Sequence, residues 1–169
     1  MLKTLTLPVP KYLQKFLIGE YREDDLTPAN ESRVPRIHVE KWSQLGALID
    51  LVSRSYPFPL PVAPARGTSI QISYYCREKS YDIPPDKYTA LVRSLDELFR
   101  RAMICEVRKV HEMAGGAYGP YVRQFLDRYG IEGDVDVDFE TMRKIYRDYL
   151  DRNDRKNRKK LCAKSPAVA

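Results

Sequence analysis

The sequence predicts an α+β protein: a small mixed sheet packed by amphipathic helices, one long and central, followed by a C-terminal helical hairpin with a basic tail. Three patterns predict this class. Residues 68–76 alternate apolar and polar side chains, as a half-buried strand does. Residues 86–113 repeat apolar side chains at helical spacing over far more than an average helix length. Two further helical patterns follow residue 117, separated by a glycine turn.

The chain begins with a predicted strand and helix. Residues 2–7 favour a short strand, because their side chains are of the β type and Pro8 follows them. Pro10 suits the first position of a helix, where a missing N–H costs nothing. The apolar face of that helix comprises Tyr12, Leu13, Phe16, Leu17 and Tyr21.

A polar loop is expected over residues 20–35, before a second strand at 36–40 with Ile37 and Val39 directed inward. A second amphipathic helix should follow, with apolar residues Trp42, Leu45, Leu48, Ile49 and Val52. The proline-rich connection at 56–66 should be extended. It could be a ligand for an aromatic groove or a connection along the protein's own surface.

The best strand, residues 68–76, should turn at 77–80 into a partner strand at 81–83. Asp86 is then expected to cap the long helix. The apolar stripe of that helix comprises Tyr88, Leu91, Val92, Leu95, Leu98, Phe99, Ala102, Met103, Val107 and Val110.

The domain organisation follows from one break, at the glycines of residues 114–117. We expect an α+β body at 1–113, a helical hairpin at 117–152 and a basic, disordered tail at 153–169. Within the hairpin, Gly130 suits the left-handed residue after a helix, and Asp138 should cap the last helix. The apolar face of the last helix comprises Phe139, Met142, Ile145, Tyr146, Tyr149 and Leu150.

The positive charge is concentrated in one segment. The chain carries a net charge of +6, and residues 141–160 alone hold nine bases and three acids, so the rest is neutral. A localised basic segment on a neutral body is typical of contact with an anionic partner. The predicted nucleic-acid-binding residues are Arg143, Lys144, Arg147, Arg152, Arg155, Lys156, Arg158, Lys159 and Lys160. A protein or other polyanion, or merely a solvated helix, remains the alternative.

The hairpin invites comparison with a helix-turn-helix, but the acidic connection at 131–138 exceeds that motif's turn of roughly three or four residues. Its aspartates, Asp134, Asp136 and Asp138, match the start of a calcium loop. The match then fails, because Phe139 stands at the glycine position and Ile145 at the glutamate position. We therefore expect an αα-hairpin and no metal site.

Recognisable catalytic motifs are missing from the sequence. With only His38 and His111, paired-histidine metal motifs are impossible within this chain. No phosphate-binding glycine loop or nucleophile elbow occurs, so we expect no cofactor and no catalytic residues. Among the carboxylates, Asp82 beside Glu78 is the best candidate for a metal-dependent nuclease.

A secondary surface is predicted at the turn after the best strand, where rings and cations combine. Such a combination can stack unpaired bases. Its residues are Tyr75, Arg77, Lys79 and Tyr81, with Tyr74 beside them.

The C-terminal quarter also resembles known sequences. The run Phe125-Leu126-Asp127-Arg128-Tyr129-Gly130-Ile131, with residues 139–147 after it, resembles small uncharacterised proteins of bacterial phages and transposable elements. The resemblance implies a role in DNA transactions, as a regulator or accessory factor, and carries no catalytic residues.

Together these patterns predict a non-enzymatic nucleic-acid-binding protein, with DNA as the expected partner. A protein-interaction, structural or inhibitory module, acting through a partner or homo-oligomer interface, is the alternative, and a metal-dependent nuclease the third hypothesis. No run of apolar residues is long enough for a membrane helix, so we expect no membrane contact. Three widely spaced cysteines favour a reducing, cytoplasmic location, with Cys76 and Cys105 in the core.

Overall fold

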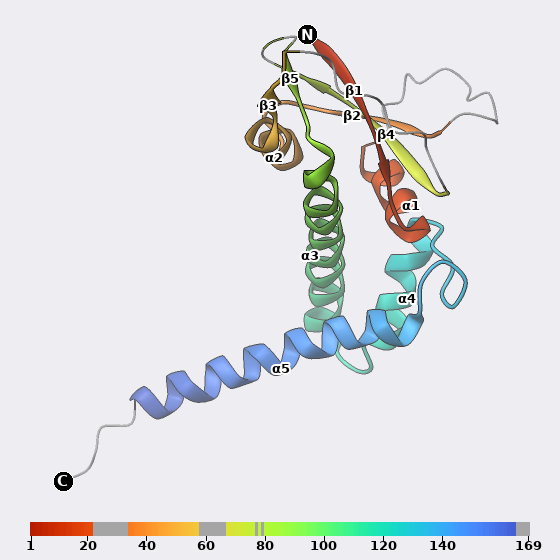
Figure 1. The fold of residues 1–169 in the computed structure, drawn as a ribbon. Helices are drawn as coiled ribbons and strands as arrows, with labels where there is room; N and C mark the ends of the chain where they lie inside the picture. The colour runs from red at the N-terminus through yellow and green to blue at the C-terminus, as the bar shows by residue number, and fades with distance from the viewer. Residues whose placement is uncertain (22–33, 58–66, 77, 79, 165–169) are drawn as a thin grey trace. The chain divides into compact units, whose positions relative to one another are not determined.

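A computed structural model describes residues 1–21, 34–57, 67–76, 78 and 80–164 of the chain (Figure 1). Most of the expected 20–35 loop and of the proline-rich connection lies outside the described residues. The chain divides into two compact units. The first comprises Met1–Phe99 with Tyr129–Ile131, and the second comprises Arg100–Arg128 with Glu132–Ala169. The division therefore falls within the long helix, α3 (Tyr88–Ala114), and not at the glycines after it.

The first unit is built on a three-stranded mixed sheet of order β1-β4-β2. β1 (Leu2–Pro8) runs antiparallel to β4 (Ser69–Tyr75), and β2 (Arg36–Val39) runs parallel to β4. The structure thus confirms the α+β class with its small mixed sheet and long central helix. Ile70, Ile72 and Tyr74 of β4 are buried, as predicted, and Gln71 and Tyr75 of the other face are more exposed, although Ser73 of that face is buried as well.

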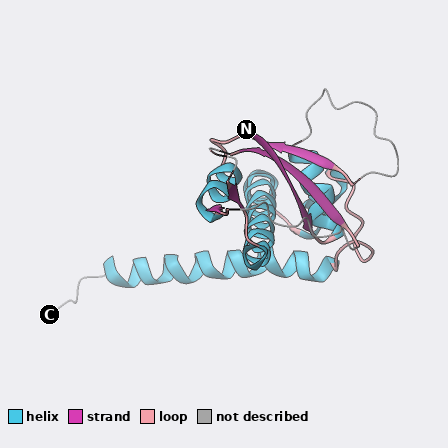
Figure 2. Cartoon of the chain, turned by 45° about the horizontal axis from the view of Figure 1, so that its top comes forward, coloured by secondary structure: helices cyan, strands magenta, loops and turns pink. Residues whose placement is uncertain are grey.

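One face of this sheet forms the core of the first unit. Three elements lie on that side: α1 (Lys11–Glu20), α2 (Gln44–Val52) and the first part of α3 (Figures 1 and 2). Their buried side chains follow the predicted helical stripes. They are Leu13, Phe16, Leu17, Leu45, Ile49, Leu91, Leu95 and Phe99.

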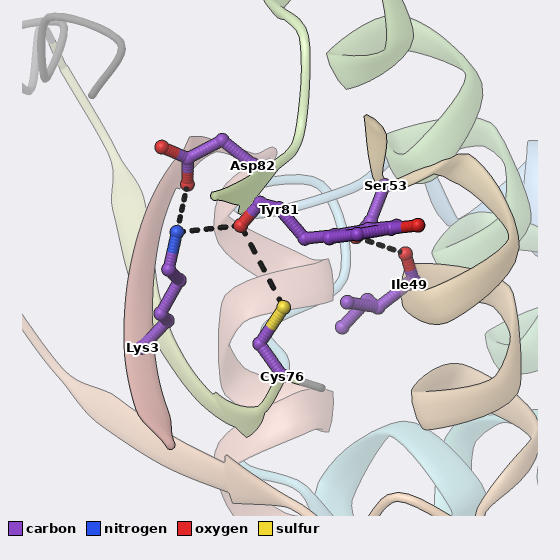
Figure 3. A network of polar contacts seen from close by, with 6 residues as sticks. All are labelled: Lys3, Ile49, Ser53, Cys76, Tyr81 and Asp82. Carbon is purple, nitrogen blue, oxygen red and sulfur yellow. Dashed lines mark hydrogen bonds and ion pairs between the residues drawn. The ribbon is translucent and has the colours of Figure 1, made fainter. Parts of the chain in front are cut away.

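A second, two-stranded sheet corrects the predicted hairpin. β5 (Tyr81–Asp82) pairs antiparallel with β3 (Arg54–Ser55), not with β4. Polar contacts link β5 to β1 instead: the Lys3 ammonium donates to the Tyr81 carbonyl and lies 3.1 Å from the Asp82 carboxylate (Figure 3). The Cys76 thiol points at the same carbonyl. The hairpin prediction was wrong because β5 pairs with a strand far from it in the sequence, and local sequence patterns do not indicate such a partner.

Three side chains lie elsewhere than predicted. Trp42 stands in the turn before α2 and is 89% exposed, because Ser43 caps the helix and accepts a hydrogen bond from the Gly46 N–H. Cys105 is exposed, whereas Cys76 is buried as expected. Asp86 lies within the 3₁₀ turn Pro85–Lys87 that leads into α3, and pairs with its neighbour Lys87.

The turn at Tyr129–Ile131 belongs to the first unit and packs on α1. The Tyr129 ring lies 5.0 Å from that of Phe16, and a Cβ at Gly19 would stand 2.6 Å from the Tyr129 ring. Gly130 has φ +63°, as predicted for the residue after a helix, and its carbonyl accepts from Lys15. The close approach explains why α1 carries a glycine at this position.

The second unit contains the rest of α3, then α4 (Gly119–Arg128) and α5 (Phe139–Lys164). Gly115 and Gly116 end α3 with positive φ angles, which confirms the predicted break. The helix α5 continues to Lys164, well beyond residue 152, where we expected disorder to begin. Its outer half is rich in good helix formers, such as Arg and Lys, which favours this continuation. None of the described helices is long and apolar enough to cross a membrane.

Candidate nucleic-acid interface

The predicted binding residues all lie on α5, whose start is fixed by Asp138. The Asp138 carboxylate accepts hydrogen bonds from the backbone N–H of Thr141, at 2.8 Å, and from its hydroxyl. These hydrogen bonds hold the pKa of Asp138 below its usual value, because they favour the ionised form. A carboxylate at this position also complements the helix dipole. Asp138 thus caps the helix, as predicted.

The inner half of α5 is anchored in the second unit by aromatic packing. Met142 and Tyr146 are buried, and the Tyr146 ring lies 5.4 Å from that of Tyr118 and 5.7 Å from that of His111. The His111 Nε2 atom lies 3.2 Å from the Gly116 carbonyl oxygen. A carbonyl oxygen only accepts hydrogen bonds, so Nε2 carries the proton of the neutral ring. The Nδ1 atom then accepts from the Tyr146 hydroxyl at 3.0 Å. Burial raises the pKa of Tyr146, which therefore stays a neutral donor.

Arg143 is partly engaged within the protein. Its guanidinium pairs with Glu140, one turn earlier, and lies 6.0 Å from the centre of the Tyr118 ring. Its Nε atom is buried without a hydrogen-bond partner. A phosphate would have to compete with Glu140 for this side chain, so Arg143 is the least available of the predicted contacts.

The other predicted contacts whose side chains the structure describes are available to solvent. Within residues 139–159, whose side chains the structure describes, none of the bases other than Arg143 forms an ion pair. Lys160 lies within the helix, but its side chain is outside the described set. The exposed bases are Lys144, Arg147, Arg152, Arg155, Lys156, Arg158 and Lys159.

Three acids interrupt this basic surface. Asp148, Asp151 and Asp154 stand four residues before Arg152, Arg155 and Arg158, a spacing that allows ion pairs. No such pair forms among these six described side chains, as is common for solvent-exposed partners. Residues 144–159 therefore present seven exposed bases against three exposed acids, a net charge of +4.

The bases of the outer half share one side of the helix. At about 100° per residue, Arg152, Arg155, Lys156, Arg158 and Lys159 cover an arc of about 160°. Asn153 and Asn157 fall on the opposite side. Amide side chains are the usual readers of adenine, and here they are turned away from the basic arc. Lys144 continues the arc toward the start of the helix, where Asp148 and Asp151 also lie, so the net positive charge grows toward the C-terminal end.

The acidic loop before α5 is occupied by its own hydrogen bonds. Asp134 accepts from the Phe139 N–H, Asp136 from the Glu132 N–H, and Asp138 from Thr141. These carboxylates line a shallow open hollow at residues 134–138. No group of three or more potential metal ligands occurs among the described residues. The loop therefore supports helix capping and carries no argument for calcium.

The nuclease candidate is also engaged elsewhere. The Asp82 carboxylate pairs with Lys3 (Figure 3), and the Glu78 carboxylate accepts from the Ser80 hydroxyl. The Lys3 ammonium, 3.1 Å from the carboxylate, offsets the charge of Asp82. Asp82 and Glu78 thus each contact a different polar partner.

The structure describes only part of the predicted secondary surface. Arg77 and Lys79 lie outside the described residues. Tyr75 is exposed at the end of β4, whereas the Tyr81 ring lies beside Ser53 and Ile49 (Figure 3). The neighbour of Tyr75 is instead His38 of β2, whose ring centre is 5.4 Å away. No local pattern in the sequence points to His38, because only the parallel pairing of β2 with β4 brings it there.

Comparisons with known proteins add no relative. No protein-family model matches the chain, and neither the curated proteins nor the solved structures contain a significant match.

Proposed function

We propose that the protein is a non-enzymatic nucleic-acid-binding protein, with DNA as its partner, and that the exposed basic side of α5 makes the contact. One observation carries the proposal. Arg152, Arg155, Lys156, Arg158 and Lys159 are exposed on one side of a helix that continues past its packed half. The outer half of this helix, residues 151–159, carries no apolar side chain to bury, so its charged side suits a surface of phosphates.

The physical basis is neutralisation of phosphates and release of their counterions. Each phosphate contact on duplex DNA adds about 0.9 to the slope of the logarithm of affinity against the logarithm of salt concentration. The anchored inner half supports the proposal, because Tyr146 holds the root of the helix. Since Asn153 and Asn157 lie on the other side, the contact should depend little on base sequence.

The biological role we propose is that of a regulator or accessory factor of a phage or mobile element. This part rests on the resemblance of residues 125–131 and 139–147 to proteins of such elements.

The test compares two triple variants of the full chain. The first carries Arg152→Gln, Arg155→Gln and Arg158→Gln. The matched control carries Arg93→Gln, Arg101→Gln and Lys109→Gln, which removes three exposed bases of α3. Fluorescence anisotropy with a labelled 20-base-pair duplex gives affinity across a salt series. We expect the slope to fall by about 2.7 in the α5 variant and to stay unchanged in the control.

A change of opposite sign sharpens the test. Asp151→Asn removes an acid from within the basic arc, so it should raise affinity. The proposal is overturned if the wild-type chain binds no duplex, or if the two triple variants lose the same amount.

A protein-interaction module is the second candidate, favoured by apolar side chains exposed near α2. Trp42 is 89% exposed and Leu51 81% exposed. Large exposed apolar side chains often mark contacts with partners. Purification of the chain with a stoichiometric protein and no nucleic acid would favour this candidate over the first.

A further inference from the structure

The three-stranded sheet has one face that carries none of the buried core. Its helices lie on the other side (Figures 1 and 2). Because side chains alternate along a strand, the register assigns residues to this open face. On β1 it presents Leu2, Thr4 and Thr6, on β4 Gln71, Ser73 and Tyr75, and on β2 Arg36 and His38. The face is therefore mostly polar, with two large exposed side chains, Tyr75 and the Leu2 that pairs opposite it.

Tyr75 is the most prominent side chain of this face. It is 54% exposed, although it lies in the central strand. His38 meets it at a ring-centre distance of 5.4 Å and an interplanar angle of 87°, so the two rings are edge-to-face. This contact fixes the orientation of the tyrosine ring without covering it. A half-exposed aromatic ring held in this way is a platform on which a flat ligand can stack.

Hydrogen-bonding groups and one cation lie along the same face. The Arg36 guanidinium donates to the Gln71 side-chain oxygen at 2.9 Å, and Arg36 itself is exposed. Ser73 lies between Thr4 and His38 by register and is buried. None of the strand residues on this face is acidic. The exposed acid Glu40 comes after the end of β2.

We propose that this open face binds a single-stranded nucleic acid, with an unpaired base stacked on Tyr75 and a phosphate at Arg36. The charge of the face fits this ligand, because its one cation has no acidic neighbour among the strand residues. The polar side chains that are not buried, Thr4, Thr6 and Gln71, fit it too, since they can hydrogen-bond to base edges of any sequence. Stacking on a tyrosine contributes about 1–3 kcal/mol per base. This site lies in the first unit and uses no residue of α5.

The test measures binding of labelled 12-nucleotide oligo(dT) and oligo(U) to the full chain by fluorescence anisotropy. Three proteins are compared: wild type, Tyr75→Ala and Tyr75→Phe. Tyr75→Ala should weaken binding about tenfold or more, whereas Tyr75→Phe keeps the ring and should bind as wild type does. Arg36→Gln should weaken binding and lower its salt dependence by about 0.7 in slope.

The two oligonucleotides separate DNA from RNA. Preference for oligo(U) would indicate a contact to the ribose 2′-hydroxyl, and binding of either one supports the site. The inference is overturned if neither binds, if Tyr75→Ala binds like wild type, or if Tyr75→Phe loses as much as Tyr75→Ala. A thermal melt checks that Tyr75→Ala remains folded, which its exposure leads us to expect.

Duplex binding distinguishes this inference from the proposed role of α5. Tyr75→Ala should leave the affinity for the 20-base-pair duplex unchanged. The α5 triple variant should lose duplex affinity. When Tyr75→Ala and Tyr75→Phe are each added to it, their difference in single-strand affinity should remain. Either site can therefore fail while the other stands.

Discussion

Tyr146 should control whether the basic helix is held in place. Its side chain is fully buried, and its hydroxyl bonds to His111 at 3.0 Å. Replacing a buried aromatic side chain with alanine costs about 3–5 kcal/mol, because a cavity remains. Tyr146→Phe keeps the ring and loses one hydrogen bond, so it should cost about 1 kcal/mol. The free energy of unfolding from urea titrations, followed by circular dichroism, measures both.

A matched variant on the next turn of α5 tests whether the loss comes from the buried packing of Tyr146 or from removing any tyrosine of this helix. Tyr149 is only partly buried and bonds to Arg108 at 3.3 Å, so Tyr149→Ala should cost much less than Tyr146→Ala. Duplex affinity should fall in Tyr146→Ala under conditions where the second unit begins to unfold, and should stay unchanged in Tyr146→Phe. If Tyr146→Ala costs under about 1 kcal/mol, or no more than Tyr149→Ala, the anchoring argument is wrong.

Two further predictions concern the polar contacts. Lys3→Met should destabilise the protein by about 2 kcal/mol, because the side chain is only 13% exposed and its ammonium bonds to both Tyr81 and Asp82. In urea titrations, the combined Lys3→Met and Asp82→Asn variant should lose less than the two single losses added together. Asp138 has a lowered pKa, so its charge stabilises the fold at neutral pH and stops doing so as pH falls through that lowered value. The difference in urea midpoint between wild type and Asp138→Asn should therefore be present at pH 7 and shrink in acid; a difference that grows in acid would contradict it.

Much of the fold could be predicted from the sequence, because several of its elements have strong local periodicity. The stripe of α3, the alternation of β4 and the glycine break after α3 are confirmed. Trp42 was predicted on the apolar face of the second helix because it is apolar and has the right spacing. Ser43 caps that helix, so the helix begins only after Trp42. The strand β3, with two residues, is too short to show a period.

The basic surface of α5 could be located from the sequence because its residues are nearly consecutive. Charge content alone does not show which bases are available. Arg143 has the same side chain as Arg147, yet it pairs with Glu140 and lies over Tyr118, while Arg147 is exposed. That difference depends on where α4 begins, since the Tyr118 ring lies just before Gly119. Packing of the second unit, more than charge spacing, therefore decides which bases are available.

The side chains of the open sheet face come together through the register of the strands, not through residues that are consecutive in the sequence. His38 stands opposite Ser73 in the parallel pairing of β2 with β4, which brings its ring to Tyr75. A shift of one residue would turn Val39 outward and His38 into the core, since side chains alternate between the two faces of a strand. Burial of Ile37 and Val39 therefore selects the register, and the register places His38 beside Tyr75. Substitutions that weaken the apolar face of β2 should for this reason reduce single-strand binding, even though none of those residues lies on the binding face.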